Sequence, residues 1–187
     1  MASGSSGEQG GKEPTGGAGF VSPKTVALYG VLTALTAAIT FVTFVPFAPT
    51  KGYFNMGDSM VFFSAFAFGW RAGAICGGVG SAAADVLLGS GYFAPYTLVA
   101  KGSEGLVAGL IDRSGNGKRW IRIIAISVGG ACMVATYFLS ELYLLDVGWG
   151  AAIAEVPGNI IQVIVGGTVG SLLAWYVRKA YPTRSRA

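Results

Sequence analysis

Six polar or charged side chains interrupt the long apolar stretches of this chain, in three separate places. They are Asp85, the pair Lys101 and Glu104, and the trio Glu155, Asn159 and Gln162. The pair is spaced by three residues and the trio by four and three, so each set would share one helix face. Polar groups at membrane depth are costly and usually functional. If the three sets lie at one depth, they predict a small polar binding pocket.

Aromatic residues fall in the segments that connect these stretches. The set is Tyr53, Phe54, Tyr92, Phe93, Tyr96, Tyr143 and Trp149. A polar pocket with aromatic walls suits a flat heterocycle, so Tyr96, Tyr143 and Trp149 join the six polar residues as candidate substrate contacts. Structural interpretations stay open for each group. These are ion pairing of Lys101 with Glu104 or Asp85, hydrogen bonding between helices by Asn159 and Gln162, and an aromatic belt at the membrane interface.

Several classes of chemistry lack their residues. The chain has no His, so neither a Ser-His nor a Cys-His arrangement can form. Residues 78–83 match a dinucleotide-binding glycine pattern only superficially, because they lie in an apolar helix with no preceding strand. There is no Walker-type phosphate loop and no metal-ligand spacing. We therefore predict a protein that is not an enzyme and has no catalytic residues, metal or cofactor.

Composition indicates a membrane protein. Of 187 residues, 52% are hydrophobic and only 12% are charged, compared with roughly a quarter in ordinary globular domains. We predict an all-α, polytopic membrane domain of six transmembrane helices over residues 23–179. A flexible Gly/Ser-rich tail (residues 1–22) precedes it, and a basic tail (residues 180–187) follows.

The apolar stretches set the expected helix bounds. The first helix ends before Pro46, and Gly69 begins a turn between the second and third helices. The expected ranges are 25–45, two limbs within 59–88 joined by a turn at 69–73, 95–111, 121–139 and 157–178, with a loop at 141–150. A rival interpretation fuses the second and third helices, but it buries Arg71 at mid-membrane.

Basic residues predict the orientation. With six helices and a cytoplasmic N-terminus, Lys51 lies outside and Lys101 within a helix, and the other eleven of the thirteen Lys and Arg residues lie inside. Both termini are then cytoplasmic, and the pocket faces outward from the cell membrane of a prokaryote. The pI near 9.2 reflects this topology and contacts with anionic membrane lipid rather than nucleic-acid binding.

Small residues form a smooth stripe on the first helix. Gly30, Ala34 and Ala38 recur every four residues, a spacing that lets another helix approach closely. This stripe suits docking of a separate protein, although packing within the chain is an open alternative. Small residues recur with a similar spacing on two other expected helices, and we assign them to packing within the chain. They are Gly73, Gly77 and Ser81 on the third helix, and Gly166 and Gly170 on the last.

Five short motifs, in order, resemble the substrate-binding S components of energy-coupling factor (ECF) vitamin transporters. They are Asn-Met-Gly-Asp at 55–58, Phe-Gly-Trp-Arg-Ala-Gly at 68–73, Gly-Ser-Ala-Ala-Ala-Asp at 80–85, Tyr-Phe-Ala-Pro-Tyr-Thr at 92–97 and Lys-Gly-Ser-Glu-Gly at 101–105. The resemblance covers about residues 24–178.

The resemblance implies six helices, an external vitamin site and a small-residue motif at Ala34 and Ala38. This motif would dock onto a transmembrane coupling protein driven by two ATPase subunits. The motifs do not fix the ligand. The pocket candidates suit a pyrimidine or pyridine compound such as hydroxymethylpyrimidine or pyridoxine, with riboflavin close behind. The alternatives are a solitary secondary carrier or channel for a small heterocycle, and a ligand-free membrane assembly subunit.

Overall fold

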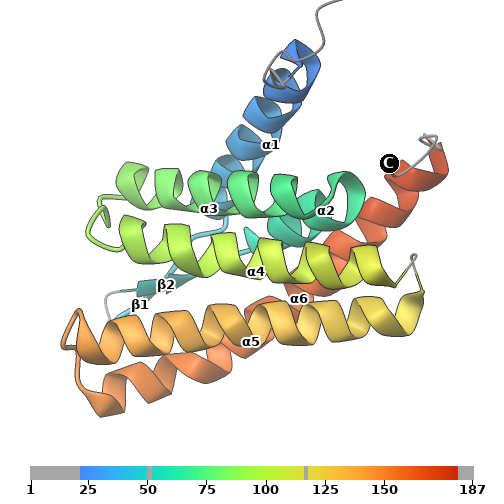
Figure 1. Cartoon of the computed structure of the whole chain (residues 1–187). Coiled ribbons are helices and arrows are strands. Elements are labelled where there is room, and N and C mark those ends of the chain that lie inside the picture. Colours follow the sequence, from blue (N-terminus) through green and yellow to red (C-terminus); the bar gives the residue numbers. More distant parts are fainter. Residues whose placement is uncertain (1–21, 50–51, 116–117, 181–187) are drawn as a thin grey trace, which may run out of the picture.

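A computed structural model describes residues 22–49, 52–115 and 118–180. The predicted tails, apart from Ser22 and Ala180, and the predicted external Lys51 lie outside these described residues. Within them, six helices form an all-α bundle with one small hairpin (Figure 1). The elements are α1 (Pro23–Val42), β1 (Val45–Phe47), β2 (Gly52–Phe54), α2 (Asp58–Phe68), α3 (Trp70–Leu87), α4 (Ala94–Ser114), α5 (Arg119–Tyr143) and α6 (Trp149–Ala180).

The predicted break between the second and third helices is confirmed. Gly69 separates α2 from α3 and has a φ of 97°, a backbone conformation that residues with a side chain rarely adopt. A single fused helix is therefore wrong. The turn is shorter than expected, because Trp70 already begins α3 and Gly73 lies within it.

Other helix bounds correct the sequence-based expectations. The first helix stops at Val42, where the Thr43 hydroxyl bonds the Ile39 carbonyl, rather than at Val45. The expected loop at 141–150 is shorter in the structure and spans only residues 144–148, because α5 continues to Tyr143 and α6 already begins at Trp149. Pro157 lies inside α6 rather than at its start. A helix satisfies its own backbone groups, and this favours longer helices at membrane depth.

The connection between α1 and α2 contains a hairpin that the sequence did not predict. β1 and β2 pair antiparallel, with Val45 opposite Phe54 and Phe47 opposite Gly52. Three-residue strands carry too little alternation to stand out from loop sequence.

Three of the described helices, α1, α5 and α6, are long and apolar enough to cross a membrane. α2 has only 11 residues, about 16 Å at 1.5 Å per residue, which is short of a hydrocarbon core of about 30 Å. Most of its residues are buried, and Phe62 and Phe66 are fully enclosed. α2 is thus the central helix around which the others pack.

Close helix contacts depend on glycine, as the spacings on the third and last helices predicted. A Cβ added at Gly73 would lie 2.8 Å from the Gly105 carbonyl oxygen of α4 and 2.6 Å from Ala65 Cβ of α2. On α6, Gly166 and Gly170 lie against the first residues of α2. These glycines pack inside the bundle.

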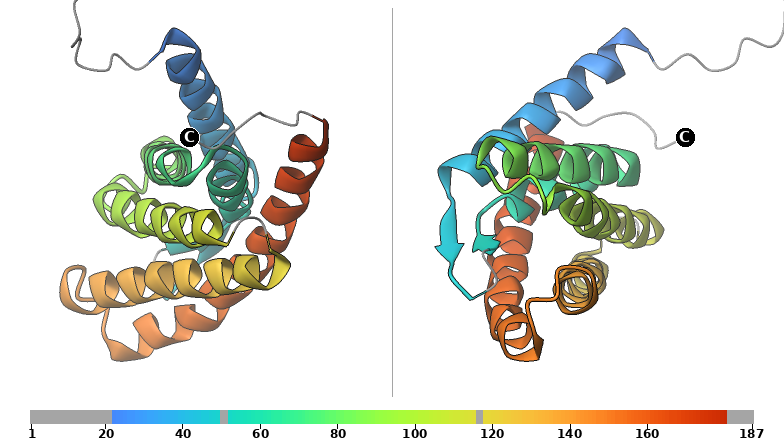
Figure 2. Two further views of the ribbon diagram at one scale, coloured as in Figure 1. Left: turned by 45° about the vertical axis from the view of Figure 1, so that its right-hand side comes forward. Right: turned by 90° about the vertical axis from the view of Figure 1, so that its left-hand side faces the viewer.

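The α1 stripe behaves differently. Gly30, Ala34 and Ala38 are exposed, whereas Leu32 and Thr36 on another face of α1 are buried. A Cβ at Gly30 would meet nothing within 4 Å. The alternative of internal packing is therefore wrong for this stripe, which lies on the outer side of a helix at the edge of the bundle (Figure 2).

The two ends of the bundle differ in the elements and ion pairs that they carry. The hairpin lies at the same end as the α3–α4 and α5–α6 turns, and the C-terminal end of α6 lies at the other (Figure 1). At that other end, Asp112 of α4 pairs with Arg122 of α5 and Arg178 of α6, each at 3.1 Å. These ion pairs join three helices at the end where the charge pattern predicts the cytoplasm.

The glycine contacts predict that adding a methyl group changes the stability of the protein in opposite directions at two positions. Gly→Ala normally favours a helix by up to about 1 kcal/mol. We expect Gly73→Ala instead to lower stability by about 1–3 kcal/mol, because the added methyl meets backbone on α4. Gly30→Ala is the matched control and should leave the melting temperature unchanged or raised.

The melting temperature of each variant in detergent measures the effect. It is taken as the temperature at which heating abolishes the monodisperse peak in size-exclusion chromatography. Equal melting temperatures for Gly73→Ala and Gly30→Ala would contradict the close α3–α4 packing.

Candidate functional site

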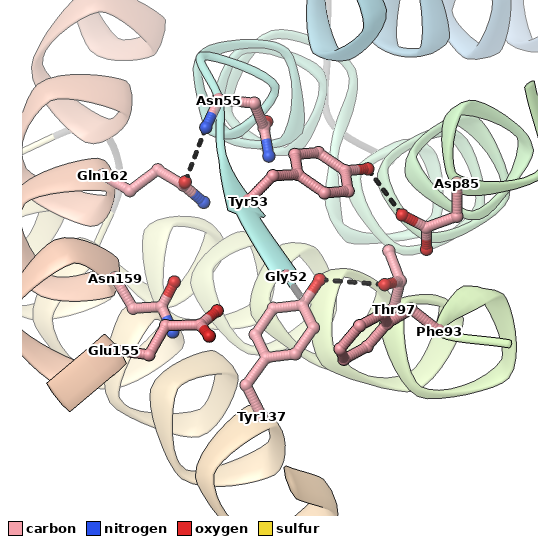
Figure 3. Close-up of a pocket in the computed structure, with 10 residues that line it drawn as sticks. All are labelled: Gly52, Tyr53, Asn55, Asp85, Phe93, Thr97, Tyr137, Glu155, Asn159 and Gln162. Atoms are coloured by element: carbon pink, nitrogen blue, oxygen red, sulfur yellow. Dashed lines mark hydrogen bonds between the residues drawn. The ribbon is translucent and has the colours of Figure 1, made fainter. Parts of the chain in front are cut away.

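A buried polar pocket lies beneath the hairpin. Its side chains converge from β2, α3, α4, α5 and α6 (Figure 3). The lining residues are Gly52, Tyr53, Asn55, Asp85, Phe93, Thr97, Tyr137, Glu155, Asn159 and Gln162. The cavity has a volume of about 20 Å³, which is room for roughly one water molecule.

The predicted polar groups meet in part. Asp85 from α3 and the trio Glu155, Asn159 and Gln162 from α6 all line this cavity. All four are buried, with exposed fractions between 1% and 6%. A spacing of four and three residues along α6 places the trio on the helix face that points into the pocket. The expected membrane depth of Asp85 and of the trio agrees with their meeting at one cavity.

Lys101 and Glu104 lie outside the cavity lining. Lys101 forms a buried ion pair with Asp58 of α2 and lies 3.6 Å from a Glu104 carboxylate oxygen. The expected pairing of Lys101 with Glu104 is confirmed, but it lies within one helix, and the ion pair that joins two helices is the one with Asp58 rather than with Asp85. The main partner is Asp58, which sequence reasoning placed only within a motif. Both carboxylates flank one ammonium group, so each buried charge has an opposite charge nearby.

Gln162 connects this ion pair to the hairpin. Its Oε1 atom accepts a hydrogen bond from the Asn55 backbone N–H at 2.8 Å, and its Nε2 atom lies 3.4 Å from Asp58 Oδ2. One side chain of α6 thus contacts both the end of β2 and the first residue of α2. The position of the hairpin is tied to the buried charges.

Tyr53 closes the other side of the pocket. Its hydroxyl donates to Asp85 at 2.5 Å, and its ring lies against Phe44 with centroids 4.9 Å apart. Burial raises the pKa of Tyr53, and the adjacent Asp85 carboxylate raises it further, so the phenol stays protonated at neutral pH. Tyr53 therefore remains a donor that holds β2 over the cavity.

The second strand is also anchored to α6. The ring of Phe54 occupies the space that a side chain at Gly158 would need. Phe54 in turn packs on Phe47 of β1, with centroids 5.2 Å apart. The hairpin is held through these rings as well as through Tyr53 and Asn55.

None of the three aromatic candidates, Tyr96, Tyr143 and Trp149, lines the cavity. Tyr96 is half-buried on α4 and does not line the cavity. Tyr143 and Trp149 are 73% and 60% exposed, and Trp149 packs edge-on against Phe138. Because α5 extends through Tyr143, that side chain lies on a helix end rather than on a loop over the pocket.

Sequence reasoning left several lining residues out of the candidate set. Tyr53 and Phe93 belonged to the connecting aromatics but were not selected. Thr97 and Tyr137 are joined by a 3.1 Å hydrogen bond, and both lie within helices. An aromatic residue inside an apolar helix gives no sequence signal that distinguishes a pocket wall from ordinary packing.

Comparisons with known proteins now bear on this arrangement. Residues 20–179 match the family model described as "ECF-type riboflavin transporter, S component". An uncharacterized protein of Pyrococcus woesei is 36% identical over 130 residues, which cover 70% of this chain and 85% of that protein.

A second relative is the thiamine precursor transporter HmpT of Lactococcus lactis subsp. cremoris (strain MG1363). It is 32% identical over 117 residues, 63% of this chain and 64% of HmpT.

A solved structure, described as "Structure and mechanism of the S component of a bacterial ECF transporter", shares the fold. It superposes with a TM-score of 0.60 at 21% identity, over 84% of this chain and 94% of that one. With the family match across residues 20–179, this chain belongs to the S components of ECF transporters, a family of multi-pass, non-enzymatic membrane proteins for vitamin uptake.

Proposed function

We propose that this chain captures a water-soluble vitamin or vitamin precursor from outside the cell and delivers it through an ATP-driven coupling module. The substrate is a pyrimidine or pyridine compound such as hydroxymethylpyrimidine or pyridoxine, or riboflavin. The observation that carries the proposal is the buried polar pocket under the hairpin, at the end of the bundle opposite the Asp112 ion pairs. A ligand-free assembly subunit would have no need of such a pocket.

The lining suits a flat ring with polar substituents. Phe93 and Tyr137 supply aromatic walls, while Glu155 and Asn159 supply acceptors and donors at one side of the cavity (Figure 3). The description of the matching family model supports riboflavin, and the printed name of HmpT supports a thiamine precursor. Both substrates therefore remain within the proposal.

The cavity must enlarge to accept either ligand. Room for about one water molecule is far below the 300–1,000 Å³ typical of small-molecule sites. The hairpin is the element most readily displaced, because two hydrogen bonds, from Tyr53 and Asn55, and the packing of the Phe54 ring hold it to α3 and α6. We propose that these two contacts open on entry of the ligand and close over it.

The exposed stripe on α1 supports the proposed docking of a transmembrane coupling protein. Gly30, Ala34 and Ala38 present a surface without large side chains, on which a helix of a transmembrane coupling protein can pack closely. Two ATPase subunits attached to that protein would supply the energy. In the proposed orientation, the pocket end faces outward and the Asp112 end faces the cytoplasm.

Asn159 tests the binding site. We expect Asn159→Ala to weaken vitamin binding by tenfold or more, because loss of hydrogen bonds inside a buried pocket costs about 1–3 kcal/mol. Isothermal titration calorimetry of the purified protein with hydroxymethylpyrimidine, pyridoxine, thiamine and riboflavin measures the change. Ile161→Ala is the control on the same helix, at a side chain that is 62% exposed. Unchanged affinity in Asn159→Ala would remove this pocket as the substrate site.

The docking face gives a separate prediction. Ala34→Leu combined with Ala38→Leu should abolish co-purification with the coupling protein while ligand affinity stays within about twofold, because bulky side chains prevent close helix approach. Val31→Leu, at an exposed apolar position of α1, is the control. Retained co-purification in the double variant would show that the partner docks elsewhere.

A further inference from the structure

A large apolar groove runs between α5 and α6, and it is separate from the polar pocket. The two cavities share no lining residue. The groove has a volume of about 620 Å³, compared with about 20 Å³ for the pocket. Its lining includes Ile126, Phe138, Ile153 and Ile164, and Ser127 is the single polar residue in it. No charged side chain lines the groove.

Small residues of α5 leave the space that forms the groove. Ala131 and Ala135 line it and are exposed. At the floor of the groove the two helices touch, because a side chain at Gly130 would collide with Val163 of α6. The groove therefore opens toward the outside of the bundle, where a membrane protein meets lipid.

Hydrocarbon is the occupant that suits this lining. An empty groove forfeits dispersion contacts, and the side chains offer water a single hydroxyl, that of Ser127. A protein helix is too wide. From Ile126 to Phe138 α5 rises about 18 Å, and a helix of that length and about 10 Å width would occupy about 1,400 Å³. This is more than twice the volume of the groove, so the groove fits a thinner chain.

The two ends of the groove carry opposite charge. Lys118 and Arg119 are exposed at the start of α5, and neither forms an ion pair with another described residue. The Asp112 carboxylate at this end is already paired with two other cations. At the other end, residues 139–153 include two acidic residues and no Lys or Arg. An anionic group is therefore attracted to the Arg119 end and repelled from the other.

Arg119 shares the groove face of α5. It precedes Ile126 by seven residues, or about two helical turns, and Ile123 lies between them on the same face. Ile123 and the neighbouring Trp120 are exposed, so they give an apolar track of about 10 Å from Arg119 to the groove. The side chain of Lys118 does not cap the first turn, and N–H groups at a helix start favour an anion.

We propose that the groove binds one hydrocarbon chain of an anionic membrane lipid, with the lipid phosphate at the Arg119 end of α5. Half of a hydrocarbon core of about 30 Å is about 15 Å. Ala131 lies about 18 Å from Arg119 along α5, so a chain that starts at Arg119 ends beside the exposed alanines. Free phosphate has no chain to fill the groove. The lipid site does not depend on the proposed vitamin pocket.

Native mass spectrometry of the full chain in detergent tests the charge at the head group. The probes are anionic phosphatidylglycerol and zwitterionic phosphatidylcholine with the same chains. We expect the wild type to retain phosphatidylglycerol at least about tenfold more, because each nearby cation favours it about fivefold. Lys118→Gln combined with Arg119→Gln should reduce this ratio to less than about threefold. Lys24→Gln combined with Arg71→Gln removes the same charge from α1 and α3 and is the matched control.

The position of the chain is tested by filling the groove. Ala131→Phe combined with Ala135→Phe should lower the retained phosphatidylglycerol at least about fivefold, because the rings take the place of the chain. Ala154→Phe, at an exposed position of α6 outside the groove lining, is the matched control. If the double variant does not fold, Ala131→Leu replaces it.

Photo-crosslinking locates the chain on the wild type without any substitution. Phosphatidylglycerol with a diazirine at the end of one chain should label segments 126–138 and 153–164 more strongly than the exposed face of α3 at Ile75 and Val79. Labelling spread evenly over α1, α3, α5 and α6 would show only a general lipid coat and overturn the inference.

Three other results would also overturn the inference. They are equal retention of the two lipids, failure of the folded wild type to retain either, and unchanged retention in the groove-filling variant. A second copy of this chain or a coupling protein that shields the groove from labelling would identify a different occupant and overturn it as well. None of these results changes vitamin binding, so the proposed function stands or falls separately.

Discussion

The buried ion pair between Lys101 and Asp58 is the contact on which the arrangement of this S component depends. Charges at membrane depth are tolerated only when they are paired. The pair joins the first residue of the short helix α2 to the middle of α4, and Gln162 extends the contact to α6 and the hairpin. Removal of one partner from a buried pair costs about 3–5 kcal/mol. The requirement to neutralise Lys101 thus fixes α2 at the base of the pocket.

The hairpin completes a site that the helices leave open. Two hydrogen bonds, from Tyr53 and Asn55, and one ring, that of Phe54, hold the hairpin to α3 and α6, whereas the helices below are packed through several glycines at backbone distance. This difference in contact strength separates a rigid base from a cover that can move. A binding protein needs both, because the base sets the specificity and the cover admits and encloses the ligand.

Sequence patterns predicted the parts of the molecule that follow from periodicity and charge. The break at Gly69, the internal glycine stripes and the outward stripe on α1 all follow from spacing that helical geometry enforces. Spacing also placed Glu155, Asn159 and Gln162 on one face of α6. These features depend on local geometry, and one sequence is enough to read them.

The remaining features depend on which segments meet, and spacing does not encode this. The Asp58–Lys101 pair joins residues 43 positions apart, and Gln162 contacts Asn55 across 107 positions. Tyr137 is an aromatic residue within a helix and carries no sign of its place in the pocket wall. The exposed Tyr143 and Trp149 were selected because a loop was expected where the structure extends two helices.

Amide hydrogen exchange of the purified protein, with and without its bound vitamin, tests the central claim most directly. The account predicts that the ligand slows exchange in the hairpin peptide covering residues 52–55 and in the α6 segment 155–162, and leaves the exposed face of α1 unchanged. Ligand binding that leaves the hairpin unprotected, or that protects only segments distant from it, would contradict a substrate site beneath this cover.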